Sequence, residues 1–274
     1  MSRPQERPDP TIPWKDLTGM TPLLTLREFL LPLPWLIASW MAFATAAWPL
    51  GALASVMFFL CALRLNHEAI HNNLGLPRWA DDLTMHGLSL LMLGSNNAVA
   101  YSHMIHHRHA MGPQDHEGKA GHMGFWRVLA YGYVFTFELT WHALKQAKPA
   151  RRRKVLIDWG LNAVIIAVAA AAGPQWLQIH VAVMILAQGL TALFAVWITH
   201  HGTKDTGLAA RSQRGPWARL AYLMFYHREH HLFPAVPVHR LPILAQRLDR
   251  DVDGYAAKTL PVIPKGLLRK TGLS

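Results

Sequence analysis

Two apolar runs, Val155–Gly173 (VLIDWGLNAVIIAVAAAAG) and Trp176–Thr199 (WLQIHVAVMILAQGLTALFAVWIT), decide the fold class of this chain. Only Pro174 and Gln175 separate them. A helix of roughly 20 apolar residues is long enough to cross the hydrocarbon core of a bilayer. The two runs are therefore predicted to form a membrane-spanning helical hairpin that barely emerges on the far side.

An earlier part of the chain repeats this arrangement. The apolar runs Phe29–Trp48 and Leu50–Leu63 are joined by an uncharged linker, and the second run is long enough to span if its helix continues to about His71. The chain is therefore predicted to be an all-α integral membrane protein with four transmembrane helices in two hairpins. Leu83–Tyr101 and Phe125–Leu144 mix apolar, polar and aromatic residues, which favours interfacial helices over a further crossing.

The distribution of charge predicts the orientation. Lys and Arg number 27 against 16 Asp and Glu, a net charge of +11. They crowd the N-terminus, the segment Lys145–Lys154 (KQAKPARRRK) and the part after Arg211, and they are absent from both tight linkers. Because basic residues favour the cytoplasmic side, both termini and the middle of the chain are predicted to be cytoplasmic, at the inner membrane if the protein is bacterial. Segments 65–154 and 200–274 would then form a cytoplasmic helical cap.

Composition excludes several other classes of protein. The chain has 274 residues, of which 51% are hydrophobic and 16% charged, so it is not a disordered chain. Its single cysteine, Cys61, excludes a disulfide framework and a cysteine-based metal site. No module with interleaved basic and aromatic positions indicates nucleic-acid binding. The positive charge is instead predicted to contact the headgroups of membrane lipids.

Histidine is the most informative residue type, with 17 copies. Many of them fall in four clusters, each just beyond a predicted span or within a predicted cytoplasmic segment. The clusters are His67 with His71, His103 with His106 and His107, His200-His201, and His227 with His230 and His231. On a helix, positions i, i+3 and i+4 share one face, so the rings within each spaced cluster project together. Eight or nine imidazoles on one side of a membrane are too many for one metal ion and about right for two.

The ligand type leaves the metal open, because imidazole suits zinc, copper, iron and nickel. Two irons could activate dioxygen and attack an unactivated C–H bond, which no side chain can do. The stretch from His67 to His71 (HEAIH) also matches the zinc-protease motif H-E-x-x-H, with Glu68 as general base. That alternative leaves both H-x-x-H-H clusters without a role.

Other polar residues near the clusters have weaker assignments. Metal-bound imidazole often donates its second N–H to a carboxylate, so each nearby acid is a candidate to orient a ligand, with ordinary surface charge as the alternative. These acids are Glu68, Asp115, Glu117 and Glu229. The isolated histidines are predicted to be structural, and His109 to be a neighbour of the site. The isolated histidines are His86, His122, His142, His180 and His239.

The order and spacing of these boxes resemble the membrane fatty-acid desaturase superfamily over about residues 30–245. The resemblance implies a di-iron centre on the cytoplasmic side of four spanning helices. It also implies a further histidine ligand near the end of the fourth span, for which we favour His200 over His201. The predicted iron ligands are then His67, His71, His103, His106, His107, His200, His227, His230 and His231.

The resemblance further implies an oxidase that uses O2 and external electrons to desaturate a fatty acyl or lipid chain. The spacing of three residues between His67 and His71 resembles that of acyl-lipid desaturases and of carotenoid ketolases, so a ketolase or hydroxylase of the same superfamily is the alternative. The chain has no G-x-G-x-x-G motif, which predicts a separate electron donor such as a ferredoxin or cytochrome. A lipophilic substrate would enter sideways from the bilayer. The predicted parts are a cytoplasmic segment 1–26, a membrane di-iron domain 27–245 and a cytoplasmic tail 246–274.

Overall fold

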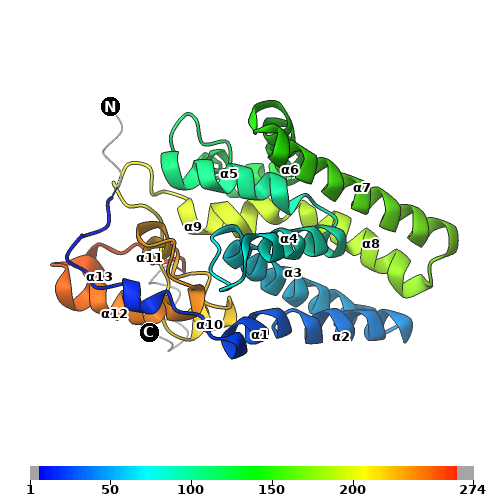
Figure 1. Cartoon of the computed structure of the whole chain (residues 1–274), viewed down its shortest axis with the longest axis horizontal. Coiled ribbons are helices and arrows are strands. Elements are labelled where there is room, and N and C mark those ends of the chain that lie inside the picture. The colour runs from blue at the N-terminus through cyan, green and yellow to red at the C-terminus, as the bar shows by residue number, and fades with distance from the viewer. Residues whose placement is uncertain (1–5, 264–274) are drawn as a thin grey trace.

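The computed structural model of the chain describes residues 6–263, and every regular element in that range is a helix (Figure 1). The all-α prediction is therefore confirmed for these residues. The outermost parts of the predicted segments 1–26 and 246–274, namely residues 1–5 and 264–274, lie outside the described range. The elements in chain order are η1 (Lys15–Leu17), α1 (Pro22–Leu30), α2 (Leu33–Ala44), α3 (Trp48–Ile70), α4 (Arg78–Met92), α5 (Asn96–His109), η2 (Gly118–His122), α6 (Phe125–Gln146), α7 (Pro149–Ala172), α8 (Gln175–Gln188), the π-helical η3 (Ala192–Trp197), α9 (Ile198–His200), α10 (Pro216–Leu220), α11 (His227–Leu232), η4 (Val238–Arg240), α12 (Leu241–Asp251) and α13 (Tyr255–Lys258).

Two of the described helices, α3 and α7, are long and apolar enough to cross a membrane. Helix α3 continues past Leu63 to Ile70, as the sequence predicts. The last apolar run forms α8, η3 and α9, which are bent by 43° and count as a third crossing only if they form one span. At this break the backbone of Gly189 lies so close to α6 that a Cβ atom on Gly132 would meet the Gly189 carbonyl oxygen at 1.6 Å. Glycine at position 132 is therefore required for this close approach.

The span predicted over Phe29–Trp48 is not one continuous helix. Helix α1 ends at Leu30, and α2 has only 12 residues. Pro32 and Pro34 lie at the junction, where proline removes backbone N–H donors from a helix interior. A helix of that length rises about 18 Å, short of the roughly 30 Å of a hydrocarbon core. By length and composition, the described helices provide two candidate crossings, or three if the bent pair is one span, and the predicted count of four is not confirmed.

Helices α4, α5 and α6 occupy the segments predicted to be interfacial. Within residues 6–263 none of these three helices is both long and apolar enough to cross a membrane. Buried Asp158 of α7 ties the turn between α4 and α5 in place. It accepts hydrogen bonds from the Ser95 hydroxyl at 2.7 Å and the Asn97 backbone N–H at 3.1 Å, and its Oδ1 lies 2.5 Å from His86 Nδ1. These contacts fix the start of α5. This helix carries three of the clustered histidines.

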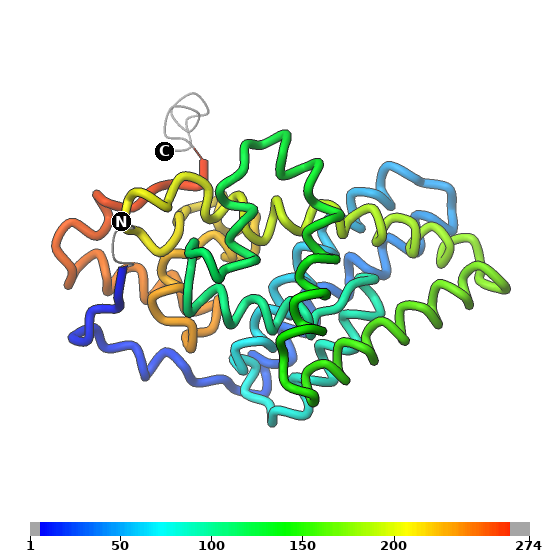
Figure 2. Tube along the Cα trace, turned by 90° about the horizontal axis from the view of Figure 1, so that it is seen from above, coloured from blue at the N-terminus to red at the C-terminus, as the bar shows by residue number. Residues whose placement is uncertain are grey.

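The C-terminal helices α10–α13 gather at one end of the molecule, opposite the turn between α7 and α8 (Figures 1 and 2). Their apolar core includes Leu232, Leu241 and Leu248, and Ile12 from the N-terminal segment packs into the same core. The predicted boundaries at 26/27 and 245/246 fall inside α1 and α12. The described parts of both terminal segments, residues 6–26 and 246–263, therefore belong to the structure that surrounds the last histidine box.

Candidate metal centre

All nine histidines predicted as ligands lie together, although the segments that carry them are far apart in the sequence. The C-terminal end of α3 carries His67 and is followed by His71, α5 carries His103, His106 and His107, α9 ends with His200, and α11 carries His227, His230 and His231. The rings form two groups, each with one ring nitrogen per residue within 4.8 Å of all the others. The five-histidine group is His67, His71, His103, His107 and His230, and the four-histidine group is His106, His200, His227 and His231.

The five-histidine group is built on close approaches between Nε2 atoms. The Nε2 atom of His230 lies 2.9 Å from that of His67 and 2.9 Å from that of His107. The Nε2 atom of His103 lies 3.1 Å from those of His71 and His107. Five nitrogens of one kind therefore face the same small space.

The four-histidine group has the same character. The Nε2 atom of His200 lies 3.1 Å from that of His106 and 3.0 Å from that of His227. The Nε2 atom of His231 lies 3.2 Å from that of His227. The two groups are neighbours, since the rings of His107 and His231, one from each group, are stacked with centroids 4.3 Å apart.

Each H-x-x-H-H box is divided between the two groups. In α5 the i, i+4 pair His103 and His107 belongs to the five-histidine group, while His106 belongs to the other. In α11 the pair His227 and His231 belongs to the four-histidine group, while His230 crosses to the first. Residues i and i+4 project more nearly in one direction than i and i+3, because a helix turns once per 3.6 residues. The spacing of these boxes therefore suits two adjacent ions rather than one.

Two of the four nearby acids hold histidine rings in place. Asp115 Oδ2 lies 2.7 Å from His106 Nδ1, and Glu117 Oε1 lies 2.9 Å from His103 Nδ1. An ionised carboxylate only accepts hydrogen bonds, so each ring carries its proton on Nδ1 and directs an Nε2 lone pair into its group. Asp115 is itself fixed, because the Gly118 backbone N–H donates to it at 2.7 Å.

The other two acids contact different partners. Glu68 accepts a hydrogen bond from the Val238 backbone N–H at 3.1 Å and lies 4.0 Å from His67 Nδ1, the nitrogen that faces away from the group. Glu229 accepts from the Ser212 hydroxyl at 2.6 Å. Glu68 therefore does not occupy the position that a general base needs beside a metal-bound water, and the zinc-protease alternative is not supported.

The protonation of the rings suits metal binding. Burial lowers the pKa of His227, His230 and His231 well below the usual value, so these rings are neutral, the form that binds metal. At His106 burial also lowers the pKa, but the hydrogen bond and charge of Asp115 outweigh it and raise the pKa overall. A metal ion at His106 would compete with a second proton for the Nε2 lone pair, while the proton shared with Asp115 would stay on Nδ1. The donor set of buried, mostly neutral imidazoles therefore fits two transition-metal ions.

The remaining histidines lie outside both groups. The ring of His201 stacks on Trp197 with centroids 4.6 Å apart, and its Nδ1 atom lies 3.3 Å from the Gly121 carbonyl oxygen. This geometry separates it from His200, which the sequence alone could not do. The other histidines outside the groups are His86, His109, His116, His122, His142, His180 and His239.

Sequence reasoning missed a third cluster at the outer side of α6. His116, Glu138 and His142 bring three further ligand atoms within 4.8 Å of one another, and all three side chains are half-buried. The i, i+4 spacing of Glu138 and His142 was the available signal. Glu138 is already engaged by the Lys119 ammonium at 2.8 Å, and the two imidazole rings stack face to face at 3.4 Å. Parallel rings direct their lone pairs side by side rather than to a common point.

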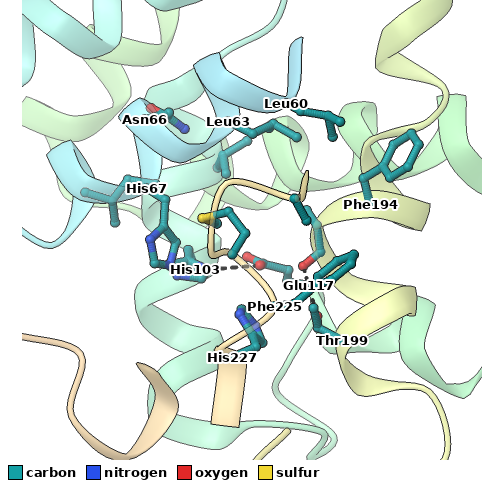
Figure 3. Close-up of a pocket in the computed structure, with 15 residues that line it drawn as sticks. Leu60, Leu63, Asn66, His67, His103, Glu117, Phe194, Thr199, Phe225 and His227 are labelled. Carbon is teal, nitrogen blue, oxygen red and sulfur yellow. Dashed lines mark hydrogen bonds and ion pairs between the residues drawn. The ribbon is translucent and has the colours of Figure 1, made fainter. Parts of the chain in front are cut away.

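An apolar pocket reaches both histidine groups. Its walls come from α3, α5, η3 and the segment 221–225, and they include Leu63, Val99 and Phe225. His67 and His103 of the five-histidine group and His227 of the four-histidine group line one end of it, as Figure 3 shows. The pocket can therefore hold a hydrocarbon directly against the candidate metal centre.

Comparison with known proteins agrees with this geometry. A family described as "Fatty acid desaturase" matches residues 25–261. The chain is also 28% identical over 204 residues to a beta-carotene ketolase from Paracoccus sp. (strain PC1), a match that covers 69% of this chain and 73% of the ketolase. The prediction of an oxygen-dependent oxidoreductase is thereby confirmed. The chain belongs to the fatty acid desaturase family.

Proposed function

We propose that this chain is a membrane-bound non-haem di-iron oxidase that uses O2 and external electrons to oxidise a lipophilic substrate. The observation that carries the proposal is the division of nine histidines into two adjacent groups with converging Nε2 atoms. Iron bound there would supply the activation of O2 and the attack on an unactivated C–H bond, chemistry that side chains cannot perform.

The protein residues have distinct roles in this proposal. Each histidine group would hold one iron, with His200 rather than His201 completing the second site. Asp115 and Glu117 would keep His106 and His103 in the tautomer that presents Nε2, since outer hydrogen bonds of this kind orient metal-binding imidazoles. The apolar walls of the pocket would exclude water and hold the reacting carbon beside the rings that line it.

The fold supports a multi-pass membrane protein. We infer that α3, α7 and the bent α8–α9 pair each cross the bilayer and that α1 and α2 together make the fourth crossing, giving two hairpins. The exposed apolar side chains of Leu26 and Met41, on α1 and α2, fit contact with lipid tails. The charge distribution would place both termini, the C-terminal helices and the metal centre in the cytoplasm.

The comparisons support two candidate substrate classes. The family match supports desaturation of a fatty acyl or lipid chain, the reaction that the sequence predicts. The ketolase relative supports oxygenation of a carotenoid as the second candidate. Both substrates are hydrocarbons for most of their length, and both fit an apolar pocket.

The electrons are proposed to come from a separate ferredoxin or cytochrome. The basic segment at the start of α7 is a poor docking surface for such a donor, because most of its charges are engaged within the molecule. Arg151 donates to the Asn97 side-chain oxygen at 2.9 Å, Arg152 to the Ala147 carbonyl oxygen at 2.6 Å, and Lys154 pairs with Asp82. A different surface would therefore receive the donor.

Metal analysis and product analysis test the proposal together. The purified protein, reconstituted with ferrous iron, is expected to hold about two irons per chain; a single zinc would contradict a di-iron oxidase. Lipids and pigments are then extracted from cells that express the protein and supply both acyl lipids and β-carotene. New double bonds in acyl chains support desaturation, and ketocarotenoids support the second candidate. A matched His230→Ala variant, which should lose turnover, controls for the host's own enzymes.

A further inference from the structure

One wall of the pocket is a short irregular segment between α10 and α11. We call residues 221–225 the α10–α11 wall. Three of its side chains, those of Ala221, Met224 and Phe225, line the pocket. Figure 3 shows Phe225 at the same end of the pocket as His227. The shape of this wall therefore affects the space directly beside the candidate metal centre.

The backbone of the wall is strained. Two consecutive residues, Tyr222 and Leu223, have positive φ angles of 51° and 65°, which bulky side chains rarely adopt. The end of α10 accounts for the first of them. The Leu223 N–H donates to the Ala218 carbonyl oxygen at 2.7 Å, and the Tyr222 N–H donates to that of Arg219 at 3.0 Å. This is a common way to end a helix, and it needs a positive φ at Tyr222 alone. Other contacts must therefore hold the wall in its shape.

Tyr222 is held at its main chain and at its side chain. Nη1 of Arg64, on α3, donates to the Tyr222 carbonyl oxygen at 2.6 Å. Nε and Nη2 of Arg64 donate to the Glu28 carboxylate of α1 at 2.8 and 2.6 Å. Arg64 and Glu28 are only 2% and 1% exposed, so water does not compete for these bonds. Trp35 Nε1, on α2, donates to the Tyr222 hydroxyl at 2.7 Å.

These contacts tie the α10–α11 wall to both histidine groups. Arg64 lies one helical turn before His67 of the five-histidine group, on the same helix. At its other end the wall runs almost directly from Phe225 into His227 of the four-histidine group. The position of the wall relative to the two groups is therefore set through Arg64 on one side and through the chain itself on the other.

A hydrocarbon substrate requires a wall of this kind. Its methylene groups are chemically alike, so polar contacts cannot distinguish one of them from the next. The shape of the pocket must then decide which carbon lies beside the metal centre. A misplacement of about 1 Å can change the rate of a reaction by about 100-fold. A small shift of Met224 or Phe225 would therefore change which carbon reacts.

We propose that Arg64 is a positioning residue, which fixes the α10–α11 wall and thereby selects the carbon of the substrate that is oxidised. This inference rests on the proposed function. Arg64 does not line the pocket, and it acts through the Tyr222 carbonyl oxygen. An ion pair that only joined α1 to α3 would need the two bonds to Glu28 and not the third.

Arg64→Lys separates these two roles. A lysine ammonium still neutralises Glu28, but it lacks the planar fork that binds Glu28 and the Tyr222 carbonyl oxygen together. The matched control is Tyr222→Phe, which loses the bond from Trp35 and keeps the carbonyl oxygen. For each iron-loaded protein in lipid vesicles, hydrogen exchange is measured over residues 221–226. Mass spectrometry then locates the new double bond or oxygen in the product.

We expect Arg64→Lys to speed exchange in the α10–α11 wall by about tenfold or more, because a hydrogen bond from a charged group is lost. The ratio of the main positional isomer of the product to its neighbours should fall by about tenfold or more. Tyr222→Phe should change both quantities less. Iron content should equal that of the wild type in both variants.

A double variant covers the case in which Arg64→Lys loses its iron. Glu28→Leu with Arg64→Met removes the whole ion pair without leaving a buried charge unpaired, and it should shift the product isomers in the same direction. Unchanged isomers in a variant with faster exchange would overturn the inference, because Arg64 would then be structural only. Unchanged exchange would overturn it as well.

The proposed function fails separately. A wild-type protein that converts neither acyl lipids nor carotenoids would refute it. Hydrogen exchange in Arg64→Lys would then still decide whether Arg64 holds the wall.

Discussion

The two histidine groups differ in the number of their rings and in how deeply the rings are buried. The difference indicates how each group would respond to the loss of one histidine. The five-histidine group includes two half-buried rings, His71 and His107. The four-histidine group has one half-buried ring, His231, and its other three are buried. Four imidazoles are a minimal set for an ion that keeps a place for oxygen, whereas five leave one to spare. The four-histidine group should therefore be the more fragile of the two.

The largest effect is expected from His200→Ala. Removing this ring leaves three imidazoles in the four-histidine group, and His201 cannot replace it because its ring is stacked on Trp197. Iron content should fall from about two to about one per chain, and turnover should be lost. Iron analysis and product formation measure the two effects. Retention of both irons would show that the four-histidine group is not an iron site.

A smaller effect is expected from His71→Ala. This change leaves four imidazoles in the five-histidine group, so the iron should stay while turnover falls. The comparison of iron retained by His71→Ala and His200→Ala is the direct test of unequal fragility. Equal loss of iron in the two variants would mean that the fifth histidine is not spare.

Replacing the carboxylates that orient His106 and His103 should weaken iron binding less than removing a histidine, and again more in the four-histidine group than in the five-histidine group. Outer-sphere partners of metal-bound histidines typically affect metal affinity by about 10- to 100-fold. Asp115→Asn should lie near the upper end of that range, since Asp115 holds both His106 and the loop at Gly118. Glu117→Gln should lie near the lower end, because Glu117 orients only His103 among the ligands. Competition with a chelator ranks the two affinities, and a reversed order would contradict this account.

The smallest effect is expected from His201→Ala. The ring belongs to neither group and stacks on Trp197, so iron content and turnover should equal those of the wild type. Loss of its stack on Trp197 should cost about 1 kcal/mol of stability, which thermal unfolding can measure. A drop in iron content would place His201 in the ligand set after all.

The sequence predicted features that depend on neighbouring residues, and it did not predict features that depend on residues far apart in the chain. The periodic boxes predicted which histidines gather, because spacing along a helix is a local property. The division of each box between two groups was not predictable, because it depends on where α3, α9 and α11 meet α5. In the same way, His200 and His201 are indistinguishable until the turn after α9 places the ring of His201 on Trp197.

The departures of the structure from the predicted helix bounds have a related cause. Hydropathy alone joined Phe29–Trp48 into one span, although Pro32 and Pro34 interrupt it. The 43° bend after α8 lies where Gly189 closely approaches Gly132, a residue far from it in the sequence. The pairing of Asp115 and Glu117 with histidines, rather than Glu68 and Glu229, was likewise set by the loop that follows α5.

The most direct test of the central claim is X-ray diffraction from crystals of the iron-loaded protein, recorded on both sides of the iron absorption edge. The account predicts two anomalous peaks, one inside the five-histidine group and one inside the four-histidine group. A single anomalous peak would contradict this account. So would a peak at His116, Glu138 and His142 if either histidine group had no peak.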